Sequence, residues 1–222
     1  MFDHIVSLGG DCFPRVSLSK VGIKKLRAQG ERSYPFDLAV TPLKSVIEMI
    51  WNDFSGYHEY KLVEKEGELL IELVKYPGTF LNHESPMSNN FFESGPLQYV
   101  KNNFEELRKR YSNRIDNFRE ILNSDNKVLF VVHLTECTSE NDVIRLIKTI
   151  EGCHPLLVFQ VLVIRLYHPV QTNIKSTEKI IFYEDLIEFT WNSSEKFTHA
   201  LAEKLKTFLL SHVFDNSQSF PI

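Results

Sequence analysis

The chain has 222 residues, 43% of them hydrophobic and 24% charged, and this balance excludes disorder as its general state. The net charge is −4, with Lys and Arg scattered among Asp and Glu, so the sequence lacks the basic stripe of a nucleic-acid-binding protein. The longest apolar run, residues 156–166, is too short to span a membrane, and the N-terminal residues do not resemble a secretory signal.

The elements predicted from apolar periodicity and turn residues alternate between strands and helices. The first half of the chain predicts a strand over 4–8, a helix beginning at Phe13, a helix over 43–54, a hairpin over 60–75 and an irregular segment over 77–95. The second half predicts a helix over 97–122, a strand over 128–133 and a helix over 141–150 capped by Thr138 or Ser139. Strands over 156–166 and 179–183 and a closing helix over 194–214 follow.

This order of elements predicts the fold class. Strands rich in Val, Ile, Leu and Phe that alternate with helices indicate a mostly parallel sheet covered on both faces. We therefore expect a three-layer α/β fold with a β-hairpin insertion. The sequence contains no repeat and no linker, so residues 1–222 are predicted to form one domain with a polar tail from about residue 215.

The cysteines bear on the compartment and on metal binding. Cys12, Cys137 and Cys153 cannot all pair and have no metal-ligand spacing, which predicts free thiols in a reducing, cytoplasmic compartment. The dinucleotide-binding, Walker, HExxH and GxSxG patterns are absent. We therefore expect neither a metal nor a cofactor.

Polar side chains follow the predicted strands, at the edge where parallel sheets bind ligands. The residues at the four strand ends are Asp11 and Cys12, then His133, then His168, then Glu184 and Asp185. A thiol, imidazoles and carboxylates at one edge can supply a nucleophile, a base and an orienting acid. The alternative is that polar residues gather there because the chain reaches the surface at every strand end.

Cys12 is the sharpest candidate, because it follows Gly9-Gly10-Asp11 at a predicted helix N-terminus. The unpaired N–H groups and the helix dipole there favour a thiolate, and the same groups can hold a developing oxyanion. Gly9 and Gly10 would let a substrate carbonyl approach the backbone. Asp11 disfavours the thiolate, and the alternative is a small buried cysteine that packs the turn.

The segment from Ile5 to Cys12, followed by Ser33-Tyr34-Pro35-Phe36-Asp37, resembles a bacterial family of papain-like cysteine peptidases that is formally a domain of unknown function. The blocks Asn52-Asp53-Phe54 and Phe80-Leu81-Asn82-His83-Glu84 also match this family, as does the helix that contains Tyr111 and Arg114. Leu38 stands where the family often has Trp, and Glu84 stands where it usually has Asp.

The resemblance implies that Cys12 is the nucleophile, that His83 is the base and that Asp37 orients the imidazole. From the residues alone, His83 is a solvated loop histidine and Asp37 serves turn or capping chemistry. A papain fold pairs a helical half with an antiparallel barrel, whereas the strand–helix alternation predicts a parallel sheet. We use the alternation for the architecture.

Two functional hypotheses follow. The first is a cysteine-dependent hydrolase or acyl transferase of the papain-like peptidase or esterase type, in which Asp37 or Asp185 positions the base and the backbone from Gly10 to Cys12 holds the oxyanion. The glycine turn also looks like the first block of GDSL esterases and like turns in acyl transferases of polysaccharide biosynthesis. A peptide, an ester or a sugar acyl group would then be the substrate.

The second hypothesis is a non-catalytic module that binds a nucleotide or a sugar at the same edge. His133 and His168 are more often structural or surface residues than catalysts at such positions. The basic run from Arg108 to Arg110 is read as a solvated helix face, with a weak anion site as the alternative. The sequence leaves the oligomeric state open.

Overall fold

The computed structural model describes residues 2–25, 27–86, 95–134, 138–166, 174–185 and 195–211. His168 and Cys137, both singled out above, lie outside these ranges.

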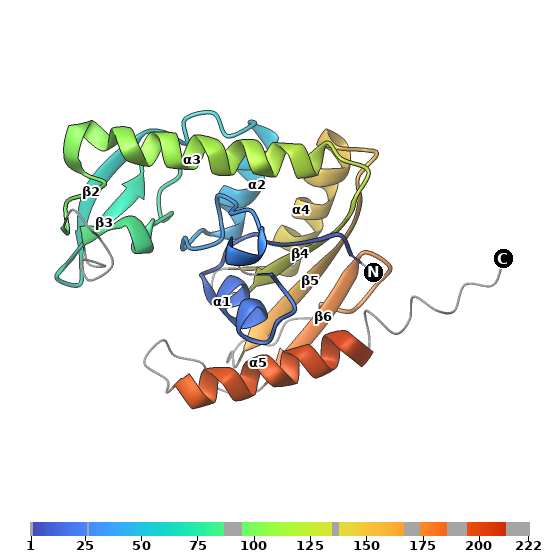
Figure 1. The fold of residues 1–222 in the computed structure, drawn as a ribbon. Coiled ribbons are helices and arrows are strands. Elements are labelled where there is room, and N and C mark those ends of the chain that lie inside the picture. The colour runs from blue at the N-terminus through green and yellow to red at the C-terminus, as the bar shows by residue number, and fades with distance from the viewer. Residues whose placement is uncertain are drawn as a thin grey trace.

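Four strands form a parallel sheet in the order β1-β4-β5-β6 (Figure 1). Their bounds are His4–Ser7 for β1, Lys127–His133 for β4, Val158–Leu166 for β5 and Ile180–Asp185 for β6. β4 and β5 occupy the centre, and almost every side chain of β4 is buried. This accounts for its unbroken apolar run and confirms the predicted parallel sheet.

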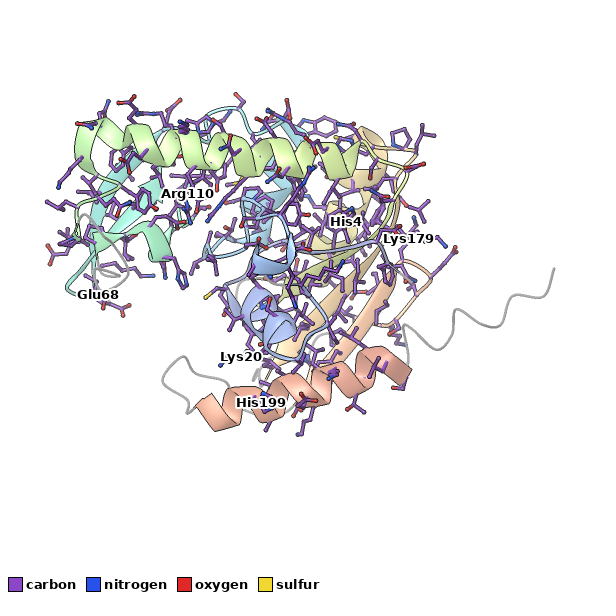
Figure 2. All side chains as sticks on the ribbon, in the orientation of Figure 1. His4, Lys20, Glu68, Arg110, Lys179 and His199 are labelled. Carbon is purple, nitrogen blue, oxygen red and sulfur yellow. The ribbon has the colours of Figure 1, made fainter. Side chains whose placement is uncertain are left out.

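Helices cover both faces of this sheet, as predicted. On one face lie α1 (Phe13–Lys20) and α5 (Glu195–Leu209), and on the other lie α2 (Leu43–Trp51), α3 (Lys101–Leu122) and α4 (Glu140–Cys153). Alternate residues of the strands point into two separate hydrophobic clusters. In β4, for example, Phe130 joins the cluster under α3 while Leu129 joins the cluster above α5. Side chains fill the space between the layers (Figure 2).

The predicted hairpin is also confirmed. It consists of β2 (Tyr60–Lys65) and β3 (Glu68–Leu73), which pair antiparallel as a separate two-stranded sheet. Glu66 and Gly67 both have positive φ, which suits the tight turn whose twist matches the strands. Two short 3-10 turns complete the order of elements, η1 at Arg27–Gln29 and η2 at Asn82–Glu84.

Two helices are shorter than the sequence predicts. The helix expected over 43–54 ends at Trp51, because Asp53 and Phe54 turn into the left-handed region. The helix expected from residue 97 begins at Lys101, and residues 102–104 also have positive φ.

Of the two predicted caps of α4, Ser139 is the one observed, and it forms a capping box with Asp142. In the described part of the chain, no helix combines the length and apolar composition needed to cross a membrane.

Candidate active site

Cys12 lies between β1 and α1, as the N-cap residue of the helix. The preceding residue fixes the turn: the Asp11 Oδ1 accepts a hydrogen bond of 2.9 Å from the Phe13 N–H and lies 3.0 Å from the Nδ1 of His133. The Phe13 and His133 rings are in contact, with centroids 5.2 Å apart. His133, the last residue of β4, therefore contacts Asp11 and Phe13, the residues on either side of Cys12. These two contacts hold the turn in place.

The two glycines serve the protein's own packing. A Cβ on Gly10 would lie 2.2 Å from the His133 carbonyl oxygen, and one on Gly9 would lie 2.9 Å from the Thr41 carbonyl oxygen. Both glycines also have positive φ. The expectation that they leave room for a substrate carbonyl is therefore corrected, because the chain itself makes the close approach.

The expected oxyanion donors also need correction. The Gly10 N–H donates to the Thr41 carbonyl oxygen at 3.0 Å, so it is already engaged. The Phe13 N–H is engaged by Asp11. Within the described residues, the N–H groups of Gly9, Asp11 and Cys12 are the ones at this turn without a partner from another residue.

The thiol of Cys12 is held in its neutral form, contrary to the expectation that the helix N-terminus favours a thiolate. Burial, together with the negative charge of Asp11, raises the pKa of Cys12 to about 12, whereas its own backbone N–H lowers it. α1 has only eight residues, so its dipole is short. Desolvation of the thiolate therefore raises the pKa of Cys12 by more than the helix N-terminus lowers it.

This pKa predicts a slow reaction of the free protein with iodoacetamide at pH 7.5. Relative to a small free thiol, the thiolate fraction falls by about three orders of magnitude, and the greater nucleophilicity of a high-pKa thiolate recovers about half of that loss on a logarithmic scale. We expect Cys12 to be alkylated about 50-fold more slowly than N-acetylcysteine, with a rate that still rises with pH above 10. Peptide mass spectrometry checks this, and a rate that levels off near pH 7 would contradict it.

Asp37 is buried between the N-terminal turn and α3, with 1% of its surface exposed. Its Oδ2 accepts a 2.9 Å hydrogen bond from the Tyr34 N–H and lies 3.7 Å from the Arg15 Nε on α1. Burial raises the pKa of Asp37, and the positive charge of Lys24 opposes this shift. The turn chemistry that the residues alone predicted is therefore present, and in the described structure no hydrogen bond joins Asp37 to His83.

His83 lies on the η2 turn, and its side chain is partly exposed. Partial burial lowers the pKa of His83, and the positive charge of Arg114 lowers it as well, while Glu84 raises it. The imidazole is therefore neutral at pH 7 and able to accept a proton. Between the described side chains of Cys12 and His83 there is no hydrogen bond.

A buried ionic cluster next to His83 was not predicted as part of the site. The Glu84 Oε1 lies 3.1 Å from an Arg114 guanidinium nitrogen and 3.2 Å from the Arg110 Nε, and its Oε2 accepts a 3.2 Å hydrogen bond from the Tyr111 hydroxyl. Glu84 is 1% exposed and Arg114 is 5% exposed. The available signal was the family resemblance, which matched Tyr111 and Arg114 without indicating what they contact.

The cluster links the two halves of the candidate site. The charge of Arg114 acts on both Asp37 and His83, and Asp37 in turn lies beside Arg15, one turn after Cys12 in α1. Figure 1 shows α1 and the turn after β3 that carries His83 on the same side of α3. The electrostatic surroundings of the candidate nucleophile and the candidate base are thus connected through buried charges under α3.

The predicted edge residue Asp185 lies apart from Cys12. Asp185 ends β6, three strand positions from β1, which corresponds to about 14 Å at the usual strand spacing. Its Oδ2 accepts a hydrogen bond from the Tyr183 hydroxyl and lies 3.2 Å from the Lys204 Nζ of α5. Among the described His, Cys, Asp and Glu residues, no group of three gathers as metal ligands would.

A comparison with protein-family models matches residues 3–168, a range that includes Cys12, Asp37, His83 and the cluster around Glu84. The chain belongs to the family described as "Putative papain-like cysteine peptidase (DUF1796)". A search of curated proteins and a search of solved structures found no match. The family supports a cysteine hydrolase class, while the parallel sheet differs from the antiparallel barrel half of a papain fold.

Proposed function

We propose that the protein is a cysteine-dependent hydrolase or acyl transferase with Cys12 as its nucleophile and His83 as its base. The observation that carries the proposal is the position of Cys12: it is the N-cap residue of α1, on the turn after β1 at the carboxyl edge of the parallel sheet, inside the region matched to a cysteine peptidase family. Peptides, esters and sugar acyl groups all contain the carbonyl that this chemistry requires.

The neutral thiol dictates how the reaction would begin. Because the pKa of Cys12 is about 12, the Sγ proton must move to a base in the same step in which sulfur attacks the carbonyl carbon. His83 is neutral and accepts that proton. The N–H groups of Asp11 and Cys12, which have no partner from another residue, then donate to the developing oxyanion. The hydrogen bond between Cys12 and His83 forms with the substrate bound, as is common for sites that are loose when empty.

Collapse of the tetrahedral intermediate expels the leaving group, which takes the proton from His83 and leaves an acyl thioester on Cys12. Water then hydrolyses the thioester, or an acceptor hydroxyl or amine takes the acyl group. His133 acts as a positioning residue in this scheme, because it binds Asp11 and packs on Phe13 on either side of the nucleophile.

The test uses p-nitrophenyl acetate as the probe, with p-nitrophenolate release and peptide mass spectrometry as readouts. We expect an acetyl group on Cys12 in the unmodified protein and no release above background in Cys12→Ala. His83→Ala should reduce the rate by about 100-fold or more, the usual contribution of a general base. Cys153→Ser and the exposed His199→Ala serve as matched controls and should leave the rate unchanged.

Acetylation at other residues with no effect of Cys12→Ala would overturn the proposal. The raised pKa of Cys12 favours a second candidate in that case, a non-catalytic module that binds a nucleotide or a sugar at the same sheet edge. Loss of activity in His133→Ala but not in His83→Ala would assign the base to the imidazole beside Asp11.

A further inference from the structure

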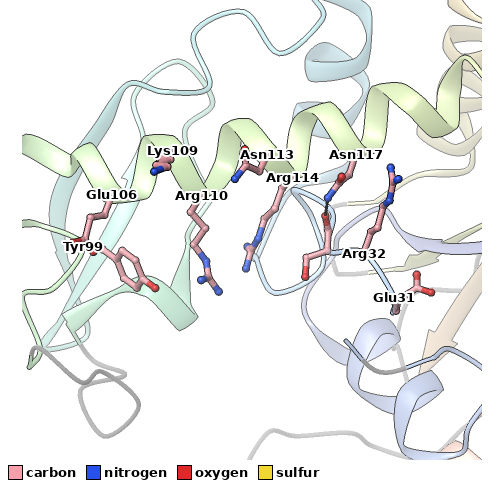
Figure 3. A pocket seen from close by; sticks show the side chains of 10 residues that line it. Glu31, Arg32, Tyr99, Glu106, Lys109, Arg110, Asn113, Arg114 and Asn117 are labelled. Atoms are coloured by element: carbon pink, nitrogen blue, oxygen red, sulfur yellow. Dashed lines mark hydrogen bonds between the residues drawn. The ribbon is translucent and has the colours of Figure 1, made fainter. Parts of the chain in front are cut away.

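A cavity of about 460 Å³ lies beneath α3, between that helix and the segment after α1 (Figure 3). Polar and charged side chains line it almost throughout. They are Glu31, Arg32, Ser33, Tyr99, Glu106, Lys109, Arg110, Asn113, Arg114 and Asn117. Four of these carry a positive charge and two carry a negative charge, so the lining has an excess of cations.

Two of the cations share a single carboxylate oxygen. Arg110 and Arg114 lie one helical turn apart on α3, and both are within 3.2 Å of the Glu84 Oε1. Figure 3 shows both guanidinium groups extending from α3 into the cavity. Arg114 is 5% exposed, and its Nη1 has no hydrogen-bond partner. A buried guanidinium donor without an acceptor is costly, so it indicates an acceptor that binds there.

The remaining charges reduce this excess without removing it, because Glu106, the second acid of the lining, offsets one positive charge. Glu31 is already paired with the buried Lys24, at 3.1 Å. Lys109 has no ion pair among the described residues, and Arg32 pairs at the surface with Glu120, outside the cavity lining. The Tyr99 ring lies 5.6 Å from the Arg110 guanidinium and supports it from one side.

We propose that this cavity binds an anionic oxygen group, a phosphate or a carboxylate, carried by the substrate. Planar guanidinium groups bind both kinds of oxyanion through paired N–H···O bonds, and two of them converge here with unused donors. That the anion belongs to the substrate rests on the proposed function, because Arg114 connects the cavity electrostatically to His83 and Asp37. The substrate is therefore an acyl compound that also carries a negative group.

The test measures binding of inorganic phosphate and of acetate by isothermal titration calorimetry and by the melting temperature, at an ionic strength held constant with chloride. We expect phosphate or acetate to stabilise the unmodified protein, with a stabilisation that rises with the logarithm of its concentration once the site begins to fill. Arg110→Gln should weaken binding by about tenfold, and Lys109→Gln should weaken it severalfold. Both residues are partly or fully exposed, so these variants are expected to fold. Arg119→Gln, on the same helix but outside the cavity, is the control.

Preferential binding of phosphate identifies a phosphorylated substrate, and preferential binding of acetate identifies a carboxylated one. No stabilisation by either anion, or an equal loss in Arg119→Gln, would overturn the proposal. The measurement is repeated in Cys12→Ala, in which anion binding should be unchanged. Anion binding without acetylation of Cys12 therefore contradicts only the proposed catalysis, while acetylation without anion binding contradicts only the cavity's role.

Discussion

Replacing Glu84 by Gln is expected to lower the free energy of unfolding by about 3 kcal/mol or more, the usual cost of removing one partner from a buried ion pair. The carboxylate is 1% exposed and accepts from Arg110, Arg114 and the Tyr111 hydroxyl. Without its charge, the guanidinium of Arg114 would stay buried with no other acid of the described residues within ion-pair distance. Urea denaturation measures this change. An unchanged slope of the unfolding free energy against urea concentration shows that unfolding is still two-state.

Glu120→Gln is the matched control, because it removes the same charge from an exposed pair with Arg32 on the surface of α3. It should leave stability unchanged, since exposed ion pairs contribute little. Equal stability of Glu84→Gln and Glu120→Gln would show that the cluster under α3 is solvated in solution. The result matters for the candidate site, because Glu84 directly follows His83 and anchors the η2 turn to α3.

Gly10→Ala is expected to destabilise the protein by about 3 kcal/mol. Two costs add at this position: the residue has a φ of 81°, and a Cβ would lie 2.2 Å from the backbone oxygen of His133. The clash is with main chain at the end of a central strand, so it cannot be relieved by a change of side-chain rotamer. Relief requires the turn that carries Cys12 to move away from β4.

Gly22→Ala provides the comparison, because Gly22 has a similar φ of 73° but no atom within 4 Å of the place that a Cβ would occupy. Gly22→Ala should lower the free energy of unfolding by about 1 kcal/mol, because it carries the cost of the positive φ without a steric clash. The difference between the two variants therefore isolates the close approach of the turn to His133. If both variants lose the same stability, the turn does not pack against β4 as described. In Gly10→Ala we also expect faster alkylation of Cys12, because displacement of the turn exposes the thiol.

These four variants probe the two contacts that place the candidate groups. The turn before α1 is fixed on β4 by Gly10, Asp11 and His133. The η2 turn is fixed on α3 by Glu84. The candidate nucleophile and the candidate base are thus held by separate elements, and substrate binding between them is the step that the acetylation experiment examines.

The sequence by itself determined the layers of the fold. Apolar runs such as that of β4 can be satisfied only by burial on both faces, so a parallel sheet between helices follows from the residue types. The hairpin followed from Glu66-Gly67 between two alternating segments. The resemblance located Cys12, His83 and the Tyr111–Arg114 helix, and the family match confirmed membership.

Only the tertiary structure decided the chemistry around those residues. The ionisation of Cys12 depends on how many neighbours exclude water, which no local motif encodes, and burial reversed the expected effect of the helix N-terminus. The purpose of Gly9 and Gly10 depended on which backbone lies beside them, the carbonyl of Thr41 at Gly9 and the end of β4 at Gly10. The pairing of Glu84 with Arg114 joins residues 30 positions apart, and it became visible only when α3 was placed across the η2 turn.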